Sequence, residues 1–113
     1  MDTRAYYRQI IEEVLSRYAS LRPSHGDIRV DVVFDEVRDR YALMQTGWDR
    51  GRRVRGSLAY LTLEEDRVII EYDGIGYGIV DDLIAGGIPK EKIVLAYLPT
   101  AEAVPPNSQV VTG

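Results

Sequence analysis

Three closely spaced glycines near the middle of the chain are the first residues whose spacing suggests ligand chemistry. Gly74, Gly76 and Gly78 lie in the stretch YDGIGYGIVDDL, between an apolar run and the start of a predicted helix. Backbone amides at such a point can hold a phosphate. However, the spacing differs from the GxGxxG of a dinucleotide-binding turn, and no lysine follows as it does in a P-loop. The sequence therefore favours a turn that leads into a helix over a phosphate site.

A second group of residues could bind an anion. Trp48 is followed by four arginines, Arg50, Arg52, Arg53 and Arg55. Arginines beside an aromatic ring can grip a phosphate backbone and stack on a base. Two other interpretations remain open: a solvated hairpin tip that offsets acids elsewhere, and a docking surface for an acidic protein or nucleic acid.

The residues that catalysis would need are scattered or missing. Carboxylates occur at 12–13 on a predicted helix surface, at 64–66 in a turn, and at 81–82 in the first turn of a second helix, where acids favour the helix dipole. His25 is the sole histidine and is expected in a solvent-facing loop, and the chain has no cysteine. We therefore expect no catalytic residue, no cofactor and no metal, and the protein is predicted not to be an enzyme.

The elements that must position these residues follow from hydrophobic periodicity. Residues 4–21 have helical spacing, with one apolar stripe (Tyr7, Ile10, Ile11, Val14, Leu15, Tyr18) opposite a polar one (Arg8, Glu12, Glu13, Arg17). Asp2 or Thr3 can cap this helix, and Pro23 with Gly26 ends it. Strands are predicted at 27–35, 40–48, 52–63 and 67–72, followed by a short helix at 79–85 and a fifth strand at 93–98.

Short turns between the first four strands predict an antiparallel meander, and hence an α+β domain with both helices packed on one sheet face. In the third strand, Ser57, Ala59, Leu61 and Leu63 alternate with Val54, Leu58 and Tyr60. Leu58 and Tyr60 are therefore expected on the second face, where they would meet another element or subunit. A sheet that is apolar on both faces predicts a homo-oligomer, with a dimer favoured.

Length and composition bound the function. The chain has 113 residues and a net charge of −4, which fits one domain, predicted at 1–100, with a loose C-terminal tail at 101–113. Residues 41–56 contain four arginines and one acid, whereas residues 57–113 contain three basic residues and nine acids. Any nucleic-acid contact would therefore be local. The absence of cysteine, of a secretory leader and of a long apolar run predicts a cytoplasmic protein without membrane contact.

The chain also resembles the XisI-like family, the controlling factors for excision of the fdxN element in filamentous cyanobacteria. The resemblance covers about residues 5–98 and rests on three stretches and the spacing between them: YRQIIEEVLSRYASLRPSHGDI at 7–28, QTGWDRGRRVRGS at 45–57, and IEYDGIGYGIVDDLIAGGIPKEKIVLAY at 70–97. In the family's turn motif D-G-x-x-x-G-I, Asp73, Gly74 and Gly78 match, whereas Gly76 stands where members tend to carry a polar residue.

The resemblance implies a small α+β protein without known catalysis. Such proteins are linked to a nuclease-like companion, with which they control when a site-specific recombinase removes a DNA element. By this likeness, the protein would be a regulatory partner that binds the companion and contacts DNA only indirectly. Two alternatives are a DNA-binding accessory factor that uses the Arg50–Arg55 hairpin, and an inhibitor of the companion nuclease whose acidic half stands in for DNA phosphates.

Overall fold

The computed structural model describes residues 2–21, 27–75 and 78–96. The elements are α1 (Thr3–Leu21), β1 (Arg29–Asp35), β2 (Arg40–Asp49), β3 (Arg52–Glu64), β4 (Arg67–Asp73), α2 (Ile79–Gly86), the 3-10 turn η1 (Lys90–Lys92) and β5 (Ile93–Leu95). This order confirms the predicted α+β fold. The predicted end of the first helix, His25, Gly76 and the tail at 101–113 lie outside the described residues.

The five strands form one sheet in the order β1-β2-β3-β4-β5. The first four strands pair antiparallel, as the short turns predict, and β5 pairs parallel to β4 because α2 and η1 form a crossover between them. The turn between β2 and β3 has two residues, Arg50 and Gly51, both with positive φ (55° and 78°). A two-residue turn of this kind matches the right-handed twist of the flanking strands.

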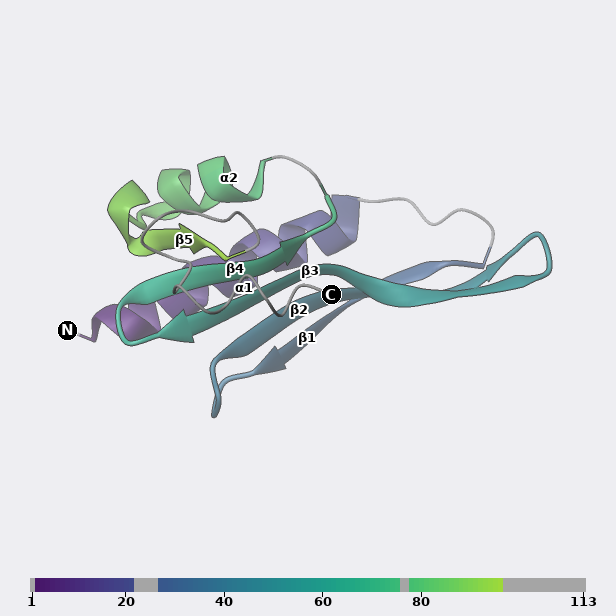
Figure 1. The fold of residues 1–113 in the computed structure, drawn as a ribbon, viewed down its shortest axis with the longest axis horizontal. Helices are drawn as coiled ribbons and strands as arrows, with labels where there is room; N and C mark the ends of the chain where they lie inside the picture. Colours follow the sequence, from purple (N-terminus) through teal and green to yellow (C-terminus); the bar gives the residue numbers. More distant parts are fainter. Residues whose placement is uncertain (1, 22–26, 76–77, 97–113) are drawn as a thin grey trace, which may run out of the picture.

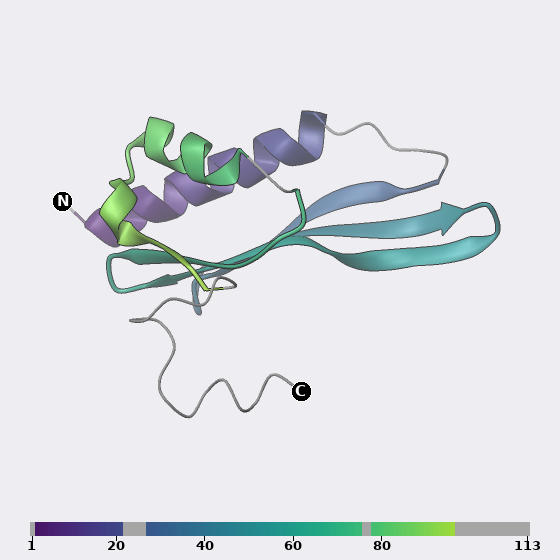
Figure 2. The ribbon, with the colours of Figure 1, turned by 45° about the horizontal axis from the view of Figure 1, so that its top comes forward.

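Both helices lie on the same face of the sheet (Figures 1 and 2). The apolar stripe of α1 is confirmed, because Ile11 and Leu15 are fully buried and the other members of the stripe are buried or half-buried. They pack against sheet residues such as Tyr41, Leu43 and Leu61, which are also fully buried. Within the described residues, no helix has both the length and the apolar character that a membrane span requires.

Asp2 caps the first helix. Its Oδ1 accepts a hydrogen bond from the backbone N–H of Arg4 at 3.0 Å, and its carbonyl accepts one from the N–H of Tyr6 at 3.1 Å. Thr3, the other predicted cap, is already the first helical residue. The side chain of Asp2 thus satisfies a backbone donor that the helix itself leaves unpaired.

One face of β3 differs from the prediction. Ala59 pairs with Leu43, but the next pair along β2 is Met44 with Ser57. Leu58 is therefore the extra residue of a β-bulge. It is 8% exposed and belongs to the core, so it is not displayed on the second face as strict alternation predicted.

Asp39 anchors α1 to the turn between β1 and β2. Its side chain is 3% exposed and accepts hydrogen bonds from Arg4 Nη2 at 2.6 Å, Arg8 Nε at 3.0 Å and the Tyr41 hydroxyl at 2.7 Å. Burial by itself would raise the pKa of Asp39, but the hydrogen bonds from Arg8, Tyr41 and Arg4 hold that pKa below its usual value. The prediction that Arg8 lies on the outer stripe of α1 is thus wrong.

Replacing Asp39 by asparagine should destabilise the fold by about 2–4 kcal/mol at neutral pH, because Arg8 and Tyr41 lose their charged acceptor in a buried site. Since the folded pKa lies below the usual value of 3.8, this stabilisation is complete above that pH and disappears only as the pH falls through the folded pKa. Urea denaturation at several pH values measures it.

Asp66→Asn is the matched control. Asp66 also holds a cation, Lys92 Nζ at 2.6 Å, but its side chain is 46% exposed. A solvated ion pair of this kind contributes little to stability, so the Asp66→Asn variant should unfold almost like the wild type. Equal losses for the two variants would contradict the role given to Asp39.

Candidate partner-binding surface

The β2–β3 hairpin extends beyond its neighbours as a two-stranded arm, at the right-hand end of Figure 1. The last pair between β1 and β2 is Arg29 with Thr46, and the last pair between β3 and β4 is Ala59 with Asp73. Residues 47–55, which we call the arginine arm, therefore lie past the edge of the main sheet on at least one side. The arm contains Trp48 and the four predicted contact arginines, Arg50, Arg52, Arg53 and Arg55.

The register brings three of these side chains to one face of the arm. Trp48 lies opposite Arg53, and Thr46 lies opposite Arg55 on one side and Arg29 on the other. Directly opposed residues of an antiparallel pair share a face. The guanidinium of Arg53 lies 5.4 Å from the centre of the Trp48 ring, within the range of a cation–π contact, and Trp48 is 50% exposed.

This face of the arm continues the sheet face opposite the two described helices. Tyr41 and Leu43 point to the helix side and are fully buried, so Met44, Thr46 and Trp48 point to the opposite side. On that open face, one row of opposed residues crosses the four antiparallel strands: Val33, Ala42, Tyr60 and Tyr72. Val33 is 52% exposed and Tyr72 49%. The predicted contact residue Tyr60 thus lies in an apolar row continuous with the arginine arm.

The arginines of the arm differ from several other arginines in their ion pairing. Arg4 and Arg8 bind Asp39, and Arg38 binds Asp35 at 3.0 Å. Among the described residues, no carboxylate forms an ion pair with any of the four arginines of the arm. Asp49, Arg52, Arg53, Val54 and Arg55 line a shallow hollow of about 340 Å³ there. The arm therefore carries positive charge that is not balanced locally, which attracts anionic groups.

The family-motif turn is held by internal contacts. Asp73 Oδ1 accepts the N–H of Ile75 at 3.0 Å, and the N–H of Gly74 donates to the carbonyl of Leu58 at 2.7 Å. Gly78 precedes α2 with φ 96°, and a Cβ there would come within 2.5 Å of the Tyr18 hydroxyl. Both properties require glycine at position 78. Asp73, Gly74 and Gly78 are thus accounted for as parts of a turn.

Tyr18 fixes the end of this turn to α1. Its hydroxyl donates to Asp82 Oδ2 at 2.7 Å, across the two helices. Burial, followed by this hydrogen bond, raises the pKa of Tyr18 to about 12. One of the two predicted first-turn acids of α2 therefore has a structural partner.

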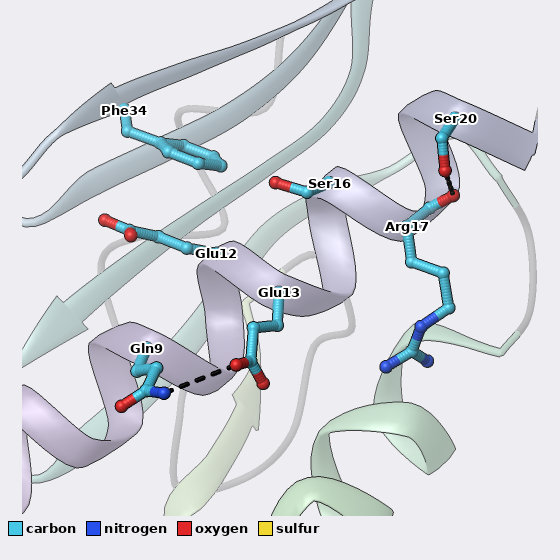
Figure 3. A pocket seen from close by; sticks show the side chains of 7 residues that line it. All are labelled: Gln9, Glu12, Glu13, Ser16, Arg17, Ser20 and Phe34. Carbon is cyan, nitrogen blue, oxygen red and sulfur yellow. Dashed lines mark hydrogen bonds between the residues drawn. The ribbon is translucent and has the colours of Figure 1, made fainter.

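A groove between α1 and β1 was not predicted from the sequence. It has a volume of about 580 Å³ and lies between Phe34 and one side of the helix, lined by Gln9, Glu12, Glu13, Ser16, Arg17 and Ser20 (Figure 3). Glu12, predicted on the outer stripe, is instead half-buried. Burial first, and then a hydrogen bond with Glu36 and the charge of Glu36, raise the pKa of Glu12 to about 7.

The sequence contains only a weak signal that Glu12 faces the groove. Glu12 follows Arg8 by one helical turn, and Arg8 also faces inward toward Asp39. Among the described residues, no three histidine, aspartate or glutamate side chains come together as a metal ion would require.

Comparison with known proteins gives the following findings. A family model described as XisI protein matches residues 1–104. The crystal structure of a XisI-like protein from Anabaena variabilis ATCC 29413 superposes with a TM-score of 0.79 at 23% identity, covering 85% of this chain and 88% of that one. The structure of the fdxN element excision controlling factor XisI from the same organism superposes with a TM-score of 0.75 at 32% identity, covering 87% and 89%. No curated protein sequence matches the chain.

Replacing Glu12 by glutamine should stabilise the protein at pH 8. As the pH rises from 4.5 to about 7, Glu12 ionises in the unfolded chain but keeps its proton in the folded one, so the wild type loses stability in this window. Glutamine avoids this loss, which we expect to be about 1–2 kcal/mol after allowance for partial exposure. Thermal unfolding at pH 8 and pH 4 measures it.

The neighbouring exposed residue provides the control. Glu13→Gln makes the same chemical change on the same helix. It should shift the melting temperature by a similar small amount at both pH values. A gain for Glu12→Gln that is as large at pH 4 as at pH 8 would contradict the proposed cause.

Proposed function

The chain belongs to the XisI family, and from this premise we propose that it is a non-catalytic regulatory protein that controls excision of a DNA element by binding a companion protein. The relative at 32% identity is an fdxN element excision controlling factor. That relative supports the regulatory role. The resemblance noted in the sequence supports a nuclease-like companion.

The observation that carries the binding role is the open sheet face with its arginine arm. Exposed Val33, Tyr72 and Trp48 lie on the sheet face opposite the described helices. At one end of it lie Arg53 and Arg55, which form no ion pair with a described carboxylate. Aromatic and arginine side chains are the types that dominate protein interfaces. The surface therefore fits a partner with an apolar patch that is flanked by carboxylates.

The distribution of charge over the chain favours a protein partner for the arm over DNA alone. The chain as a whole carries a net charge of −4, and residues 57–113 are strongly acidic. A DNA duplex that approached the arm would be repelled by the rest of the molecule unless the companion covered those acids. An acidic protein surface needs to match only the arm.

Reversing two arm charges should weaken binding to the co-expressed companion. In Arg53→Glu/Arg55→Glu, the carboxylates of the partner would meet like charges, and we expect at least a tenfold loss of affinity, or about 1.4 kcal/mol. Size-exclusion chromatography and titration calorimetry at micromolar concentration measure it. Arg17→Glu, an exposed charge reversal on α1, should bind like the wild type.

The single tryptophan gives a second readout. Trp48 labelled with 5-fluorotryptophan should give one fluorine resonance, which shifts when the companion binds the arm. An unshifted resonance in a stable complex would place the interface elsewhere. Separate elution of the two co-expressed proteins would contradict the proposed function itself.

Direct DNA binding is the second candidate, because Trp48 and the four arginines of the arm, which pair with no described carboxylate, could grip a phosphate backbone. If all four arginines held phosphates, the affinity of the protein alone for a duplex would fall with salt with a log–log slope of about −3.6. Fluorescence anisotropy with a short labelled duplex measures this slope. We expect no such binding by the protein alone, and a slope of this size would favour the second candidate.

A further inference from the structure

Strand β1 forms an edge of the sheet. Its one partner among the described strands is β2, with an uninterrupted register from Arg29–Thr46 to Asp35–Arg40. The strand has no proline and no bulge, two devices with which proteins protect such edges. Val32 and Val33 are 37% and 52% exposed, on opposite faces. An extended and regular edge of this kind, with apolar side chains exposed on both faces, is a template for another strand.

We propose that β1 of a second copy of this chain pairs antiparallel with this edge, about a two-fold axis at Val32. In this register, Arg29 lies opposite Asp35 of the second copy, Val30 lies opposite its Phe34, and Val32 lies opposite its own equivalent. Opposite charges thus face each other at both ends of the pair and apolar side chains face each other at three positions, whereas Asp31 lies opposite Val33. Apart from these two positions, the sequence RVDVVFD is complementary to itself when it is read in reverse.

The neighbouring two-fold registers are unfavourable. An axis at Asp31 would place two Asp31 carboxylates face to face. An axis at Val33 would place Asp31 against Asp35 of the second copy. Like charges directly opposite each other destabilise a strand pair, so the charges select the register centred on Val32.

The α1–β1 groove supports the same occupant. A two-fold axis perpendicular to the sheet keeps both copies of α1 on one face, so Val30 and Phe34 of the second copy would lie on the same face as Phe34 of the first. That face borders the groove between Phe34 and α1 (Figure 3). The groove thus gives the apolar side chains of the added strand a place beside α1.

The charges at the strand ends are available for this pairing. Arg29 lies 3.7 Å from Asp31, and both side chains are more than half exposed. The side chain of Asp35 is 36% exposed; its Oδ2 binds Arg38 at 3.0 Å, and its Oδ1 accepts the backbone N–H groups of Val37 and Arg38, each at 3.1 Å. Because the Arg29–Asp31 contact is loose and solvated, it costs little to exchange for an intermolecular one. The arginine arm extends beyond β1, so the pairing leaves it open to another partner.

The absence of cysteine makes the register directly testable. Val32→Cys places one thiol per chain on the proposed axis, where mild oxidation should link two copies rapidly. Asp31→Cys and Val33→Cys, each alone, should link several-fold more slowly, because each lies opposite the other position. An equal mixture of these two variants should give the mixed dimer.

Each of these cross-linking outcomes decides between registers. Val32→Cys chains that stay monomeric would overturn the proposal. Faster self-linking of Asp31→Cys or Val33→Cys would also overturn it, because it would place the axis on one of those residues.

A charge exchange tests the same interface without a covalent link. Arg29→Glu would place a carboxylate opposite Asp35 of the second copy, at two symmetric sites, and should raise the dimer dissociation constant about tenfold. Circular dichroism should show an unchanged fold, because Arg29 is exposed. Sedimentation equilibrium of the full chain measures the dimer, with Arg52→Glu on the arm as the matched control.

Two sedimentation results would overturn the proposal. A wild-type protein that remains a monomer at high micromolar concentration has no such dimer. A dimer that Arg52→Glu disrupts and Arg29→Glu does not would be formed by the arm. Neither result bears on whether a companion protein binds, so this inference can fail while the proposed function stands.

Discussion

The buried carboxylate of Asp39 is the contact on which the arrangement of this molecule depends. It lies in the turn between β1 and β2, with positive φ, and is held by two arginines from α1 and by Tyr41 from β2. An isolated buried carboxylate is costly, so these donors and the carboxylate stabilise each other only when α1 lies in this position. The contact therefore sets where the helix crosses the sheet. The groove beside Phe34 and the exposed edge of β1 follow from that placement.

Because both described helices lie on one face of the sheet, they leave the opposite face of the sheet uncovered (Figure 2). Tyr41, Leu43 and Leu61 are fully buried on the helix-bearing face, whereas Val33 and Tyr72, at the two ends of the row on the other face, are about half exposed. Most antiparallel sheets with one covered face are polar on the other. Here the open face carries valine and tyrosine in its centre and arginine with tryptophan at one end. The proposed binding role rests on this departure from the usual pattern.

Sequence periodicity predicted the elements and their order, because the stripe of α1 and the alternation of β1 are each complete over several turns or residues. It missed features that depend on long-range contacts. The bulge at Leu58 breaks the period of two, and no local residue signals it. Arg8 and Glu12 face inward because Asp39, Phe34 and Glu36 approach them from β1 and its turn. The arm residues were found from composition alone, but their common face follows only from the register.

The distribution of charge explains how an acidic protein can present a basic contact. Arg4, Arg8 and Arg38 are neutralised by carboxylates within the fold, whereas the arm projects away from the sheet, where no described carboxylate reaches its arginines. The net charge of −4 is therefore a poor guide to the local field at the tip of the hairpin. The edge of β1 differs again, since one arginine stands at its start and an aspartate at its end, with a second aspartate between them. A strand with opposite charges at its two ends favours an antiparallel copy of itself, whereas an arm of net positive charge favours an acidic partner. The two proposed interfaces would thus take different occupants by charge.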